Sequence, residues 1–119
     1  MGFSFSNNDK LIDMYKLCFY VPDSHLERVK NALFAIGAGQ FNHYDQCCWQ
    51  VLGESQFRPL ANSQAFIGEI DQLQIVPEYK VEMICRDELI KPALQALLAN
   101  HPYQQPAYDV SKILTVDDF

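Results

Sequence analysis

Basic residues are scarce in this chain of 119 residues, where nine Lys and Arg stand against 15 Asp and Glu for a formal charge of −6. Nucleic-acid binding depends on clustered Lys and Arg that neutralise phosphates, and anionic membranes attract the same clusters. Here the few basic residues are scattered along the chain. The sequence therefore predicts neither a nucleic-acid partner nor a membrane partner.

Long apolar runs and the common catalytic motifs are also missing. No run approaches the ~20 apolar residues of a membrane-spanning helix, and residues 1–10 lack the basic and apolar regions of a signal peptide. The sequence contains no G-x-S-x-G, H-E-x-x-H or P-loop motif. We therefore expect a cytoplasmic protein, and nothing in the sequence predicts an enzyme.

The four cysteines form no C-x-x-C pair, which argues against a zinc knuckle. They are Cys18, Cys47, Cys48 and Cys85. The adjacent pair would point to opposite faces of a strand, which does not favour chelation. We expect reduced, mostly buried cysteines that behave as small hydrophobic residues.

What the chain does contain is enough apolar material for one packed domain, with 49% hydrophobic and 13% aromatic residues. Alternating apolar and polar residues predict strands at 14–21, 46–52, 56–60, 72–85 and 107–114. Gly53-Glu54-Ser55 is typical of a hairpin turn between the second and third of these strands. Pro59 confines the third strand to an edge or to its end.

Two helices are predicted from apolar residues at helical spacing. The first runs over 24–36, where Ser24 and Glu27 have the spacing of a capping box and Gly37 provides a left-handed end. The second follows Asp87 as N-cap and carries Ile90, Ala93, Leu94, Leu97 and Leu98 as its apolar stripe. Pro92 fits this helix only within about its first turn.

The resulting order β-α-β-β-β-α-β predicts an α+β ferredoxin-like sandwich, in which two helices cover one face of an antiparallel sheet. A polar lead-in (1–13) and an acidic tail (115–119) flank a single domain (14–114). The uncovered sheet face carries Cys18, Tyr20 and Ile84. Such a partly apolar face is typical of one that is buried by self-association.

Two loops concentrate the unusual residues. The first contains Gly37 and Gly39, with Asn42 as the next residue most tolerant of positive φ, and is followed by His43, Tyr44 and Asp45. The second, 101–109, places His101, Tyr103 and Tyr108 among two prolines that stiffen the chain. Each loop presents side chains suited to a ligand.

A divalent metal site would need His43, Asp45 and His101 to converge, and therefore needs the two loops to meet in space. Alternatively, His101 caps backbone carbonyls at the end of a helix. Arg58 is isolated at a strand end, where it could hold an anion or form a structural salt bridge. Glu78 and Glu82 are about 13 Å apart along one strand face, too far for an acid–base pair, and are expected to be surface charges.

Four segments resemble the YqfO-type domain of the Nif-three-like family. Residues 101–109 (HPYQQPAYD) resemble its HPYEEPAYD signature, 39–47 its G-R-I-G-N-Y-x-x-C loop, and 53–59 its G-x-G-x-F-R-P hairpin. Residues 66–68 resemble its small loop before the long third strand. The resemblance covers about 15–114.

This resemblance implies a CutA- and PII-like protein, which is ferredoxin-like and typically trimeric. In longer family members the domain is inserted within a larger domain that carries a dinuclear metal site. This chain resembles only the insert, so the hydrolase labels of full-length relatives should not transfer to it. Gln104 and Gln105 replace the glutamates of the signature, and neutral amides are poorer ligands for hard cations.

Together these observations predict a small, self-associating binding or regulatory module, with a homotrimer favoured. Its ligand, a small molecule or a protein, would contact His43, Tyr44, Arg58, His101, Tyr103 and Tyr108. The alternative hypothesis is a metal-binding or metal-dependent protein that uses His43 and His101, with Asp45, to hold a divalent ion.

Overall fold

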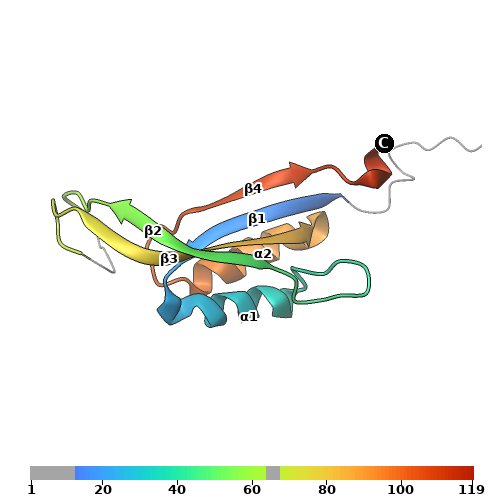
Figure 1. Ribbon diagram of the computed structural model, residues 1–119, viewed down its shortest axis with the longest axis horizontal. Coiled ribbons are helices and arrows are strands. Elements are labelled where there is room, and N and C mark those ends of the chain that lie inside the picture. The colour runs from blue at the N-terminus through green and yellow to red at the C-terminus, as the bar shows by residue number, and fades with distance from the viewer. Residues whose placement is uncertain (1–12, 64–67) are drawn as a thin grey trace, which may run out of the picture.

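A computed structural model describes residues 13–63 and 68–119. Its elements, in chain order, are β1 (Met14–Val21), a 3-10 turn (Asp23–His25), α1 (Leu26–Ile36), β2 (Trp49–Phe57), β3 (Gln74–Arg86), α2 (Asp87–Asn100), β4 (Tyr108–Ile113) and a second 3-10 turn (Val116–Asp118). The strands form one antiparallel sheet in the order β2-β3-β1-β4. Both helices lie on the same side of it (Figure 1). The predicted α+β ferredoxin-like architecture is confirmed.

The hydrophobic core lies between the sheet and the two helices, because alternate residues of the central strands point to that side. Leu17, Phe19 and Val21 of β1 are fully buried, and β3 adds Val81, Met83 and Cys85 from across the register. The helices contribute Val29, Leu33, Ala93 and Leu97. The residues between these core positions therefore face away from the helices, and we call that side of the sheet the helix-free face.

One predicted hairpin is wrong, because Gly53-Glu54-Ser55 lies inside β2 and not in a turn. Gly53 pairs with Glu78, and the ladder continues without interruption to Phe57 opposite Gln74. The φ of Gly53 is not positive, and pairing along the 13-residue β3 overrides the local turn preference. The order is therefore β-α-β-β-α-β, and β2 ends before Pro59 is reached.

The start of α1 also differs from the prediction. His25 is the N-cap residue and no side chain caps the helix, because the chain enters α1 through the 3-10 turn. Ser24 lies within that turn, and its hydroxyl is 2.8 Å from His25 Nδ1. At the other end, Gly37 is left-handed as predicted, with φ of 110°.

Pro92 is the sixth residue of α2, in its second turn and beyond the first turn to which a proline was expected to be confined. The proline removes the N–H that would bond to the Glu88 carbonyl. The helix nevertheless continues to Asn100. Burial of Ala93 and Leu97 on its inner side stabilises α2 despite the missing bond.

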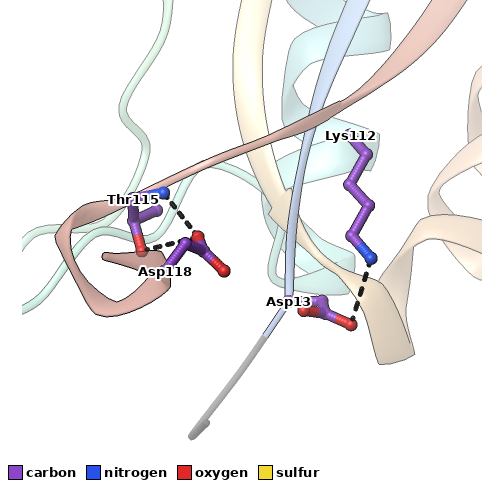
Figure 2. A network of polar contacts seen from close by, with 4 residues as sticks. All are labelled: Asp13, Lys112, Thr115 and Asp118. Carbon is purple, nitrogen blue, oxygen red and sulfur yellow. Dashed lines mark hydrogen bonds and ion pairs between the residues drawn. The ribbon is translucent and has the colours of Figure 1, made fainter. Parts of the chain in front are cut away.

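Two separate polar contacts lie near the C-terminal end of the chain (Figure 2). Lys112 of β4 forms an ion pair with Asp13, with 3.7 Å between Nζ and Oδ2. The Asp118 carboxylate accepts a hydrogen bond of 2.6 Å from the backbone N–H of Thr115 and closes the final 3-10 turn. Among residues 13–63 and 68–119, no helix is long and apolar enough to cross a membrane.

Candidate ligand site at the end of β1

The connector from α2 to β4, residues 101–107, passes around the end of β1. Its last residue accepts a hydrogen bond of 3.2 Å from the Tyr20 N–H through the Ala107 carbonyl. Its first residue, His101, is buried with 7% of its surface exposed. The connector therefore continues the pairing of β4 with β1 as far as Tyr20 and lies against the end of β1.

Both ring nitrogens of His101 have backbone partners. Nδ1 lies 3.1 Å from the Tyr103 N–H, and Nε2 lies 2.6 Å from the Tyr20 carbonyl. Since a ring nitrogen that faces an N–H must accept, Nδ1 is unprotonated and Nε2–H donates to the carbonyl. His101 therefore joins the connector to β1 as a neutral ring. Neither nitrogen of this ring has a lone pair left for a metal.

Tyr103 packs between His101 and the end of β2. Its ring centroid is 4.9 Å from that of His101 and 6.4 Å from that of Phe57. Burial of the phenol, together with the neighbouring Glu78 carboxylate, raises the pKa of Tyr103 above its ordinary value. Tyr103 is therefore a neutral, buried phenol whose polar end faces a carboxylate.

Glu78 is the carboxylate of this cluster and is only 6% exposed. Its Oε2 atom is buried, and the carboxylate shares a side-chain hydrogen bond with the Tyr103 hydroxyl. The expectation that Glu78 is a surface charge is therefore wrong. β1 ends at Val21, opposite Tyr79, and the connector covers the neighbouring Glu78 in its place.

A hollow of about 210 Å³ lies next to Glu78. The register places it on the helix-free face, because Lys80 is opposite both Tyr20 and Val51 and Glu78 is opposite Gly53. Gly53 has no side chain and thereby leaves room above β2. The hollow is lined by Tyr20, Val51, Gly53, Glu54, Ser55, Glu78 and Lys80.

The other predicted loop lies at the opposite end of the sheet from the connector (Figure 1). It forms a small hairpin in which Phe41 and Tyr44 exchange two backbone hydrogen bonds of 2.9 Å. The positive φ predicted for Gly39 and Asn42 is confirmed, at 78° and 52°. His43, Tyr44 and Asp45 are exposed.

One chain therefore does not bring His43 and His101 together. The metal hypothesis required the two loops to meet, and within one chain they do not. Within residues 13–63 and 68–119, no three His, Cys, Asp or Glu side chains gather closely enough to hold a metal ion. Arg58 is exposed just beyond β2, and Tyr108 begins β4 opposite Phe19. Of the predicted site residues, only His101 and Tyr103 are shown in contact.

Four residues that complete this end of the site were not predicted from the sequence, namely Tyr20, Phe57, Glu78 and Lys80. Each lies in a strand with ordinary alternation, so no local signal marks it. Only the register of β3 with β1 and β2 brings them together. Gly53 opposite Glu78 is the feature that could have pointed to a hollow, had its position inside a strand been recognised.

We expect acid to weaken the folded state through His101. Burial lowers the pKa of His101 below its ordinary 6.5, and this effect outweighs the opposite influences of the Tyr20 carbonyl and Glu78. The unfolded chain then binds a proton more readily than the folded one. The His101 contribution is complete above pH 6.5 and is lost as the pH falls from there towards the folded-state pKa.

Urea unfolding at about pH 8.0, 6.5 and 5.5 measures this dependence. The midpoint should fall below pH 6.5 in the natural chain. His101→Gln cannot titrate, so its midpoint should be lower at about pH 8 and flatter across the same interval. A variant whose midpoint falls as steeply as that of the natural chain would show that another group carries the effect.

Comparison with known proteins identifies relatives of this chain. No family model matches the chain. A Listeria monocytogenes protein named GTP cyclohydrolase 1 type 2 homolog is 42% identical over 96 residues, which are 80% of this chain and 26% of that protein. A solved Bacillus cereus protein related to NIF3 aligns with a TM-score of 0.75 and 31% identity, over 86% of this chain and 26% of its own. The chain is a relative of one segment of the NIF3-related proteins.

This chain spans about a quarter of the length of those relatives. The activity in their names belongs to proteins with a much larger remainder, so it is not assigned to this segment. CutA1 from Oryza sativa aligns over 89% of this chain and 84% of its own, with a TM-score of 0.65 and 16% identity. That likeness is one of fold alone, and it confirms the CutA-like architecture.

Proposed function

We propose that this NIF3-related chain is a small, self-associating binding or regulatory module that performs no catalysis of its own. The observation that carries the proposal is the exposure of apolar side chains along β2. Trp49 is 57% exposed, and Val51 and Leu52 are exposed beside it. Exposed apolar strands of this kind are costly in water unless another surface covers them.

The β2–β3 ladder supports the same proposal from its shape. It extends past the ends of both helices (Figure 1), so the helices cannot cover its outer part. Ile75 and Leu73 are more than half exposed near that end. A second copy of the chain would cover these residues, and the resemblance to CutA and PII proteins favours a closed trimer.

Self-association would also bring the two separated loops into one site. The loop with His43 and Tyr44 and the connector with His101 and Tyr103 lie at opposite ends of one subunit (Figure 1). Neighbouring subunits in a closed ring would place unlike ends against each other. We propose that the ligand binds at this cleft, with Arg58 and Tyr108 near its margin.

We propose that this protein is located in the cytoplasm. All four cysteines are free thiols in the structure, which fits a reducing compartment. Burial raises the pKa of Cys85 to about 11 and also raises that of Cys18. These two thiols are therefore unreactive; Cys85 lies in the core, and Cys18 is buried on the helix-free face.

Trp49, the only tryptophan in the sequence, reports directly on the proposed contact. Its emission should shift to shorter wavelength as protein concentration rises from nanomolar to micromolar, because association moves the indole from water into an interface. Leu98→Glu, at an exposed position on the helix side, should leave the shift unchanged. Water-exposed emission at every concentration would exclude Trp49 from an interface and contradict the proposal.

A further inference from the structure

The small hairpin that precedes β2 presents two aromatic rings to solvent. Phe41 is 55% exposed and Tyr44 is 71% exposed. The two residues pair directly across the hairpin, which places their side chains on the same face. We propose that this hairpin docks on a second copy of the chain, with the Phe41 ring in the hollow above Gly53. The inference deepens the self-association proposed above and rests on it.

The hairpin is fixed in its exposed position. The Gly39 N–H donates to the Ile84 carbonyl, and the Gly39 carbonyl accepts from the Cys47 N–H, each over 2.8 Å. Asn42 and Gln46 have positive φ, at 52° and 55°, and turn the chain tightly. A segment that is already ordered loses little conformational entropy on binding, which favours its use as a docking element.

The hollow suits one apolar side chain. Although three of its seven lining residues are charged, the wall that it exposes is almost entirely apolar. A Cβ added at Gly53 would meet no other atom within 4 Å, so there is open space above β2. The volume of about 210 Å³ is below the ~300–1,000 Å³ of pockets that enclose drug-sized molecules. A single aromatic ring is therefore a better match than a large ligand.

The hairpin does not reach the hollow of its own chain. It lies beyond the start of β2, as the teal loop at the right of Figure 1 shows. Gly53 is four residues into that strand, which is about 13 Å farther along the sheet. The contact therefore joins two copies. Because the hairpin and the hollow are unlike surfaces, the contact is of the heterologous kind that can close a ring.

Two observations favour a second copy as the occupant of the hollow. Val51 lines the hollow and is exposed beside Trp49, so the hollow is continuous with the β2 surface for which we propose self-association. The hairpin from Phe41 to Tyr44 contains no Asp, Glu, Lys or Arg. Its docking therefore buries no unpaired charge and adds nothing to the repulsion between copies that each carry −6.

Sedimentation velocity of two single variants of the full chain tests the inference. Phe41→Ala removes the ring from an exposed position, and Gly53→Leu fills the hollow from its floor. Each should weaken association by at least about tenfold while circular dichroism shows a folded chain. Leu98→Ala is the matched control, because Leu98 is 47% exposed on the helix side, and it should associate like the natural chain.

Unchanged association in Phe41→Ala would overturn the inference, and this variant keeps the test decisive if Gly53→Leu does not fold. If Gly53→Leu weakens association and Phe41→Ala does not, another segment of the second copy occupies the hollow. That result also overturns the inference.

The double variant Phe41→Ala/Gly53→Leu tests whether the two positions touch. If they do, loss of the ring makes room for the leucine, and the double variant should associate at least about tenfold more tightly than Gly53→Leu alone. A double variant that associates more weakly than either single variant would place the two positions in separate contacts and overturn the inference.

The mass of the natural chain separates this inference from the proposed function. An oligomer that persists in both single variants would defeat the docking of the hairpin and leave self-association intact. A natural chain that stays at 13.7 kDa across the micromolar range would contradict both.

Discussion

Replacing Gly39 with alanine should destabilise the fold by about 3 kcal/mol. Gly39 has a φ of 78°, where an alanine costs roughly 1–2 kcal/mol. A Cβ there would lie 2.7 Å from the Cys47 carbonyl oxygen and 2.9 Å from the ring of Phe34. The obstructing atoms include backbone, which cannot move aside without breaking other contacts, and such overpacking costs about 1–3 kcal/mol.

Those contacts join the loop to the sheet. The Gly39 N–H donates a hydrogen bond of 2.8 Å to the Ile84 carbonyl, and the Gly39 carbonyl accepts one of 2.8 Å from the Cys47 N–H. The substitution therefore disturbs the loop that leads into β2 and presents His43. Chemical unfolding with a circular-dichroism readout measures the change.

Gly53→Ala is the matched control for this substitution. Gly53 lies in β2 without a positive φ, and a methyl group added at its Cα would have no other atom within 4 Å. The stability of this variant should stay within about 0.5 kcal/mol of the natural chain. If Gly39→Ala is as harmless as Gly53→Ala, the left-handed turn and its packing against Cys47 are incorrect.

Trp49→Glu should abolish self-association at micromolar concentration and leave the monomer folded. The indole is 57% exposed, so its removal costs the isolated subunit little. In an interface, an exposed tryptophan is a typical hot spot, whose loss costs about 2 kcal/mol or more. A glutamate buried there would add an unpaired charge, so we expect at least about a hundredfold weaker association.

Analytical ultracentrifugation of the variant measures this effect, with circular dichroism to verify folding. Leu98→Glu serves as control, because Leu98 is 47% exposed on α2, away from the helix-free face. It should associate like the natural chain. If Trp49→Glu keeps the full association constant, β2 is not the contact surface.

Elements that depend on local periodicity were predictable from the sequence. The bounds of β1 were predicted to the residue, and Ile90, Ala93, Leu94 and Leu97 of the second predicted apolar stripe pack in or against the core, whereas Leu98 is exposed. Gly37 was recognised as a helix end because a left-handed residue is needed there. Each of these features is determined by residues close together in the chain.

Features that depend on strand pairing were not predictable. Gly53 was interpreted as a turn because its preference for turns is local, whereas its pairing with Glu78 joins residues far apart in sequence. The same long-range register buries Glu78, although alternation alone predicts a surface charge there. His101 was singled out from its local sequence, but its partner is the carbonyl of Tyr20, 81 residues away.

The mass of the full chain in solution tests the central proposal most directly. Sedimentation velocity at about 10 μM should give a single species of about three times the 13.7 kDa of one chain. That mass should persist at about pH 8 and fall in Trp49→Glu. A species of 13.7 kDa across the micromolar range would contradict the account, because β2 would then remain uncovered in water.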